Sequence, residues 1–159
     1  MRIVVAAVGR LKDGAERDLA ERYRGLAEGL GRRLRIGPVD VTELAESRRG
    51  TVDERRQDEA RRLLDAGGEG LIIALHERGR ALDSAAFAAL LRTSREEAHP
   101  RMAFLNGGPD GHGPEALAAA RIQLSLGAMT LPHGLARIVL LEQIYRALTI
   151  LAGHPYHRA

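Results

Sequence analysis

The residue types best suited to chemistry lie in the last third of the chain, and the first group of them is a glycine-rich loop. The loop, GGPDG at residues 107–111, follows an apolar run at 102–106 and precedes Gly113-Pro114-Glu115, where a helix can begin. Glycines let the backbone adopt positive φ angles and let a ligand approach the main chain closely. In open parallel sheets, ligands bind beyond the carboxyl ends of the strands. The pattern therefore predicts a ligand-binding loop, although a tight strand-to-helix turn without a ligand would have the same sequence.

Two further segments carry candidate functional residues: the first is an apolar loop and the second is a polar tail. Residues 124–133 read LSLGAMTLPH, and HPYHR occupies residues 154–158. Tyr156 can stack on a nucleic-acid base, and arginine side chains can contact phosphates or base edges. Histidine titrates near neutral pH and is the commonest general base. We interpret the region 104–158 as a cofactor pocket, a subunit interface and a substrate-facing tail, in that order.

Alternating strands and helices upstream would position these segments. Apolar runs predict strands at 2–8, 34–41, 70–75 and 102–106, and helical spacing predicts helices at 16–30, 51–65 and 84–95. Thr51-Val52-Asp53-Glu54 matches a capping box at the second helix, and Asp83 or Ser84 can cap the third. Residues 76–80 are typical of a turn. This order favours an α/β fold with a mainly parallel sheet flanked by helices on both faces.

The composition is that of a single globular domain. Of the 159 residues, 45% are hydrophobic and only 3% are aromatic, so the core must be built from Leu, Ile, Val and Ala. A chain of this length can bury roughly 70% of the surface that it exposes when unfolded. No internal repeat, low-complexity tract or linker divides it, so we expect one domain spanning residues 1–159.

Several classes of protein and of site are excluded. No run approaches the roughly 18 apolar residues of a membrane span, and the apolar N-terminus lacks a signal-peptide cleavage pattern. The absence of cysteine excludes disulfides and thiolate sites, and the six histidines form no compact ligand set, so we expect no metal. The formal net charge of +3 is too small to argue for nucleic acid on its own. We expect a cytoplasmic protein that does not bind a membrane.

A long apolar segment at 135–152 predicts both a helix and an interface. About 18 residues of α-helix are roughly 27 Å long. Apolar side chains occupy all sides of this helix, so it must be buried on more than one side. The sheet can cover one side, and a second subunit would be the economical cover for the rest. A central helix in a monomer would have the same pattern.

Taken together, these motifs resemble the RlmH family of 23S ribosomal RNA pseudouridine-N3 methyltransferases, which belong to the SPOUT superfamily. The resemblance covers the full length and depends on the order and spacing of its motifs. They are IVVAAVG at 3–9, the glycine loop, the segment 124–133, Arg137, EQIYRA at 142–147 and HPYHR at 154–158. The chain departs from the family at Asn106, where the family usually has an aliphatic residue, and at Gly134. Both departures could alter the pocket wall, and neither changes the glycines.

The resemblance implies a fold, a cofactor and an assembly. The implied fold is a single SPOUT domain whose C-terminal segment is threaded as a trefoil knot, which no sequence pattern would predict because true knots are rare. The implied cofactor is S-adenosylmethionine, bound in the knot mainly by backbone groups, and the implied assembly is a homodimer. Apolar side chains there can sandwich an adenine ring, although the leucines can equally belong to the core. The cofactor-binding positions carried over are Leu75, Gly107, Leu126, Gly127, Ala128, Met129, Thr130 and Leu131.

The implied reaction is methyl transfer from a sulfonium to N3 of a pseudouridine in 23S ribosomal RNA. That nitrogen is a poor nucleophile while protonated, so its proton must leave, and the protein must align donor and acceptor with little water present. The general base is not identified; its candidates are His133, His154 and His157, although His133 can equally orient the following helix. The modest charge favours an assembled ribosome over free RNA as the substrate. The candidate RNA contacts are Arg137, His154, Tyr156, His157 and Arg158.

Two alternatives stay open from the sequence. A nucleotide-binding oxidoreductase would use the glycine loop, but Gly107, Gly108 and Gly111 do not follow the spacing G-x-G-x-x-G, and no acidic residue is placed for a ribose. A non-catalytic ribosome-binding module would keep the fold and the cofactor residues without transferring a methyl group.

Overall fold

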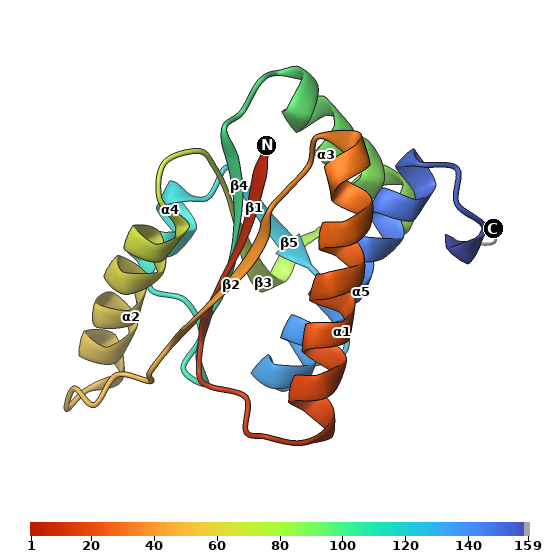
Figure 1. The fold of residues 1–159 in the computed structure, drawn as a ribbon. Helices are drawn as coiled ribbons and strands as arrows, with labels where there is room; N and C mark the ends of the chain where they lie inside the picture. The colour runs from red at the N-terminus through yellow and green to blue at the C-terminus, as the bar shows by residue number, and fades with distance from the viewer. Residues whose placement is uncertain (158–159) are drawn as a thin grey trace.

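The computed structural model describes residues 1–157, the last by its backbone only, and its centre is a five-stranded sheet between two layers of helices (Figure 1). The strands are all parallel and lie in the order β2-β1-β4-β3-β5. The predicted α/β fold with a mainly parallel sheet is therefore confirmed. The strands are β1 (Arg2–Val8), β2 (Val39–Leu44), β3 (Leu71–Ala81), β4 (Arg101–Asn106) and β5 (Ile122–Ser125).

Helices cover both faces of the sheet. One face carries α1 (Ala15–Gly31), α3 (Ser84–Glu96) and α5 (His133–Leu151), and the other carries α2 (Val52–Gly67) and α4 (Pro114–Ala119) (Figure 1). Two short 3-10 helices span Arg32–Leu34 and Pro155–His157. Alternate residues of β1 face the two layers: Ile3 and Val5 pack with the first, and Ala6 and Val8 with the second. Because both faces are covered, β1 has a continuous apolar sequence.

Side-chain hydrogen bonds fix two helix starts as the sequence predicts. Thr51 Oγ1 accepts a hydrogen bond from the Glu54 N–H at 3.2 Å, and Glu54 Oε2 accepts one from the Thr51 N–H at 3.0 Å. Asp83 Oδ1 accepts one from the Ala86 N–H at 2.7 Å, so Asp83 caps α3. Each such cap stabilises its helix by about 1 kcal/mol.

Two predictions about the outer strands are wrong. The strand expected at 34–41 starts too early, because residues 32–34 form a 3-10 turn and β2 begins at Val39. The sequence patterns also miss β5, whose four residues lie within a stretch that otherwise reads as a loop. A four-residue strand at the edge of a sheet is too short to establish a periodic pattern.

The predicted turn at 76–80 is also wrong, because β3 continues through it to Ala81. The strand is irregular there, since Leu75 and Arg80 both lie opposite Leu124 of β5. Gly79 permits this path: a Cβ atom at that position would lie 2.6 Å from the backbone of Gln123. The glycine that suggests a turn is in fact required for close approach of two strands.

The long apolar helix is buried largely within its own chain. Ten residues of α5 are buried, and the helix packs against both α1 and α3. Its apolar sequence therefore does not by itself require a second subunit. Some apolar surface stays open, since Leu19 and Leu26 of α1 and Leu135 of α5 are 39%, 40% and 41% exposed. Neither α5 nor any other helix among residues 1–157 has the length and hydropathy needed to cross a membrane.

Candidate functional site

Three adjacent strands bring the predicted cofactor segments together near one edge of the sheet. Leu75 of β3 lies opposite Leu124 of β5. On its other side β3 is paired with β4, which leads directly into Gly107. The segment 126–131 begins where β5 ends. The three segments therefore lie side by side near the edge where parallel sheets bind ligands, and only β3 continues beyond it, to Ala81.

The segment after β5 is partly packed and partly exposed. The Gly127 N–H donates to Ser125 Oγ at 3.2 Å, and Ser125 Oγ donates to the Gly127 carbonyl at 3.0 Å, so the chain turns sharply there. Leu126 and Gly127 line a cavity of about 380 Å³ between β5, the start of α3 and α5. Met129, by contrast, is 84% exposed. The expected apolar sandwich is therefore incomplete in a single chain, where the exposed positions also include Ala128, Thr130 and Leu131.

The glycine loop rests on His112, a buried histidine that has no place in the predicted site. His112 is 9% exposed, and its Nε2 lies 3.1 Å from the Leu105 carbonyl oxygen. A Cβ atom on Gly107 would lie 3.3 Å from the His112 ring, so only a residue without a side chain fits easily there. Burial lowers the pKa of His112, and the Leu105 carbonyl opposes this shift. The histidine is therefore neutral at pH 7 and supports the loop. The one sequence feature that could have indicated this role is its position directly after the glycines.

We expect the free energy of unfolding to fall as the pH drops below about 6.5, in part because of His112. Since the folded-state pKa of His112 is lowered, the unfolded chain binds a proton that the folded chain does not. The contribution is complete above the unfolded pKa and is lost in acid by at most about 1.4 kcal/mol per pH unit. Urea denaturation between about pH 7 and pH 5 would measure it. His112→Gln keeps a donor for Leu105 but does not titrate, so it should reduce the slope; an unchanged slope would disprove the assignment.

Asn106 and His133 join the end of β4 to the start of α5. Asn106 is 3% exposed, and its Nδ2 donates to the His133 carbonyl oxygen at 2.9 Å. The His133 ring lies over Gly9 at the end of β1, where a Cβ atom would be 2.8 Å from Nε2. At the second departure, Gly134, a Cβ atom would lie 3.1 Å from Leu11. An aliphatic residue at 106 could not donate this hydrogen bond, so Asn106 and Gly134 both suit the local packing. His133 lies at the same sheet edge as the cofactor segments.

Arg137 is buried and holds the end of β1. Its side chain is 1% exposed, its Nη2 donates to the Gly9 carbonyl at 2.7 Å, and its Nη1 donates to Glu43 Oε1 at 3.2 Å. Burial lowers the pKa of Arg137, and Glu43 opposes this shift. A guanidinium buried in this way is not open to RNA in the single chain, so the predicted RNA contact of Arg137 would need a different conformation.

The polar tail folds back onto the C-terminal end of α5. The rings of Tyr156 and Tyr145 have centroids 4.7 Å apart, and the Arg146 guanidinium lies 5.1 Å from the Tyr156 ring. Tyr156 Oη donates to Glu142 Oε1 at 3.1 Å. Burial raises the pKa of Tyr156, so its hydroxyl is a donor at neutral pH.

The tail does not meet the cofactor segments within one chain. It follows the C-terminal end of α5 (Figure 1), and its Tyr156 packs against Glu142 and Tyr145, roughly 14 to 18 Å from His133 along the helix. His154 is exposed on the tail. The side chain of His157 and the whole of Arg158 lie outside the described residues. Over the part of the chain that is described, no three His, Asp or Glu side chains form a group that could hold a metal ion.

Known proteins resemble this chain over nearly its whole length. A family model described as "Predicted SPOUT methyltransferase" matches residues 1–157. Three relatives named ribosomal RNA large subunit methyltransferase H, from Rhodopseudomonas palustris strain BisB5, Nitrobacter winogradskyi and Afipia carboxidovorans, are each 51% identical to this chain. The first covers 100% of both chains, the second 99% of both and the third 100% of both.

A solved structure gives a weaker likeness. It is a methyltransferase from Legionella pneumophila in complex with S-adenosylmethionine, and the match covers 92% of this chain and 66% of that one. The identity is 14% and the TM-score is 0.47. A similarity this low places no ligand on this chain.

Proposed function

Because the chain belongs to the SPOUT methyltransferase family, we propose that it transfers a methyl group from S-adenosylmethionine to N3 of a pseudouridine in 23S ribosomal RNA. The observation that carries the proposal is 51% identity over the full length to relatives named as methyltransferases of large-subunit ribosomal RNA. Membership of a methyltransferase family removes the oxidoreductase alternative. A non-catalytic module of the same fold is distinguished by the experiments below.

We place the cofactor at the edge formed by Leu75, Gly107 and the segment 126–131. The residues present suit it: Gly107 exposes bare main chain, and Leu126 and Gly127 line an adjoining cavity of about 380 Å³. Main-chain groups at this edge would satisfy the polar rim of an adenine, and the leucines would pack on its faces. S-adenosylmethionine would supply a methyl group activated by its sulfonium. The trefoil knot belongs to the same proposal, with the chain between β5 and α5 wrapping the cofactor.

Among the three candidate histidines, His133 is best placed to receive the proton of the pseudouridine N3. It lies over Gly9 and is tied to Asn106, at the same edge as the cofactor segments. His154 lies at the far end of α5. The protein's main contribution would be alignment of donor and acceptor in a site with little water.

The assembly that we propose is a homodimer in which the tail of one subunit completes the site of the other. Tyr156 packs against Glu142 and Tyr145, which lie roughly 14 to 18 Å from His133 along its own α5, so a second copy would be needed to bring it near the methyl acceptor. The exposed leucines of α1 and α5 offer apolar surface for such a contact. Light scattering should give twice the mass of the 17.3 kDa chain. A fully active monomer would contradict the shared site.

The test of the reaction is nucleoside analysis of ribosomal RNA from cells that lack this protein. We expect the loss of one methyl group from one pseudouridine of 23S RNA, restored by the intact gene. Unchanged nucleosides would disprove the proposal. If purified protein binds S-adenosylmethionine but transfers no methyl group, the chain is a non-catalytic module.

The substrate form is tested separately. We propose that the enzyme acts in the cytoplasm on the assembled ribosome, because a net charge of +3 per chain is too small to capture free RNA by charge alone. In matched assays, we expect the rate of methylation to be much higher on ribosomes than on protein-free 23S RNA. Equal rates on both would overturn this part of the proposal.

A further inference from the structure

One guanidinium joins the glycine loop to the loop before α2. Arg55 Nε donates to Asp110 Oδ2 at 2.6 Å, and Nη2 approaches Oδ1 at 3.4 Å. The remaining nitrogen, Nη1, donates to the carbonyl oxygens of Arg49 and Gly50 at 3.3 and 3.4 Å. All three nitrogens of this arginine are therefore engaged, two with a carboxylate and one with two carbonyls.

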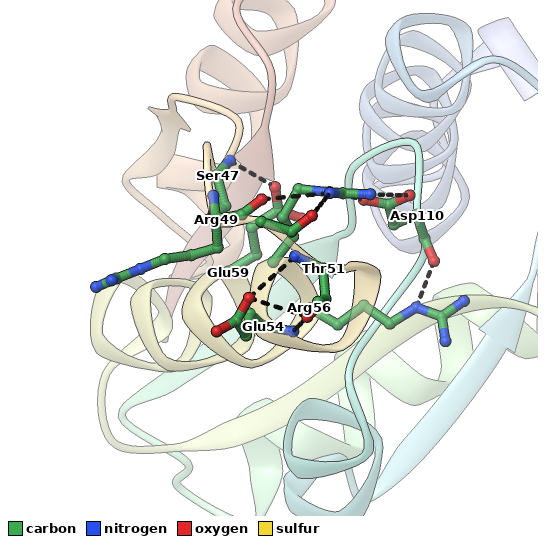
Figure 2. Close-up of polar contacts among 9 residues, drawn as sticks. Ser47, Arg49, Thr51, Glu54, Arg56, Glu59 and Asp110 are labelled. Carbon is green, nitrogen blue, oxygen red and sulfur yellow. Dashed lines mark hydrogen bonds and ion pairs between the residues drawn. The ribbon is translucent and has the colours of Figure 1, made fainter.

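The neighbouring residue on α2 adds a second tie to the same aspartate. Arg56 Nε donates to the main-chain carbonyl of Asp110 at 2.7 Å (Figure 2). A Cβ atom on Gly113, just beyond the glycine loop, would lie 2.8 Å from the Arg56 carbonyl oxygen. The loop and the first turns of α2 therefore approach each other as closely as main chains allow.

A buried carboxylate lies beneath the loop. Glu59 of α2 is 3% exposed, and its Oε1 accepts a hydrogen bond from the Ser47 N–H at 2.8 Å (Figure 2). A Cβ atom on Gly108 would lie 3.0 Å from Glu59 Oε2 and 2.8 Å from Val8. The glycine loop is thus seated on α2, and the loop at 47–50 is fastened to the same helix.

These contacts are made to the first turns of α2, whose conformation is well fixed. The capping box of Thr51 and Glu54 fixes the first turn (Figure 2). The Arg55 and Asp110 side chains are each 27% exposed, so their ion pair is partly buried. Arg55 holds the pKa of Asp110 below its usual range, so the carboxylate stays charged at neutral pH. Charge-assisted, two-pronged pairs of this kind are stronger and more directional than ordinary surface ion pairs.

We propose that Arg55 and Asp110 are positioning residues that hold the glycine loop in its cofactor-binding conformation. The inference rests on the proposed function, because it assigns the pair a role in binding S-adenosylmethionine at Gly107. Neither side chain needs to touch the cofactor. The fork of arginine is essential to this role, since a lysine ammonium keeps the charge but cannot bind both carboxylate oxygens and two carbonyls in fixed directions.

The test compares cofactor affinity with stability in five variants. Arg55→Lys and Asp110→Asn should each weaken S-adenosylmethionine binding about tenfold by calorimetry, the loss expected when a charge-assisted contact is removed. The double variant should also lose only about tenfold in affinity relative to the wild-type protein, because the two residues act as one unit. Arg61→Lys is the matched control: Arg61 lies on the same helix, but it pairs with Asp58 and not with the glycine loop.

A merely structural pair would give a different result. The melting temperatures of the cofactor-free Arg55 and Asp110 variants should lie close to that of Arg61→Lys, and Asp110→Glu should recover part of the affinity. Wild-type affinity in Arg55→Lys and Asp110→Asn would overturn the inference, as would a double variant about a hundredfold weaker. Failure of the wild-type protein itself to bind S-adenosylmethionine would instead refute the proposed function, so the two failures are distinguishable.

Discussion

Replacing Arg137 with methionine is expected to lower the free energy of unfolding by about 1–3 kcal/mol. The side chain is 1% exposed, and its removal leaves the Gly9 carbonyl without its 2.7 Å donor. Glu43 also loses a partner at 3.2 Å in a partly buried position. Glu43 keeps Arg17 as a partner at 3.3 Å, so most of the cost comes from the Gly9 carbonyl, which loses its side-chain donor. Urea denaturation of the purified proteins measures the difference.

Arg24→Met is the matched control for this prediction. Arg24 pairs with Glu21 and Glu28 on the surface of α1, so its loss should cost about 0–1 kcal/mol. The comparison separates burial from simple removal of an arginine. If Arg137→Met is as stable as Arg24→Met but methylates RNA poorly, the original expectation of an RNA contact is restored and the structural role is wrong.

Replacing Gly107 with valine is expected to weaken S-adenosylmethionine binding about a hundredfold, an effect typical of small displacements in a binding site. A Cβ atom at 107 already lies 3.3 Å from Gly111 and from the His112 ring. The γ-methyl groups of valine must therefore push the loop away from its seat or occupy the space of the cofactor. Calorimetry measures the affinity, and the melting temperature reports whether the fold survives.

Gly107→Ala provides the graded control. Its single methyl group needs a shift of only a few tenths of an ångström, so we expect a loss of less than about tenfold. Binding by Gly107→Val at the wild-type level would mean that the cofactor does not approach the main chain at this position.

The parts of the fold that sequence reasoning predicts are those with strong local causes. β1 and β4 are covered on both faces and therefore appear as unbroken apolar runs, and Thr51 and Asp83 carry the side-chain chemistry of a helix cap. The glycine loop follows from the same logic, because a strand that ends in glycines before a helix has few other conformations.

The remaining features depend on contacts between distant segments. Gly79 is required by the approach of β5 and not by a turn, and the burial of Arg137 depends on where β1 ends. The support by His112 and the tie from Asn106 to His133 have no local pattern at all. The knot stays a prediction of the resemblance, since threading is a property of the whole path of the chain. Tertiary contacts, and not propensity, decide these features.

Amide hydrogen exchange with and without S-adenosylmethionine tests most directly whether three separate segments of the chain form one cofactor site. The account predicts slower exchange in the peptides that contain Leu75, Gly107 and the segment 126–131, all at the same cofactor concentration. Protection that is absent at saturating cofactor, or that lies only in other parts of the chain, would contradict it.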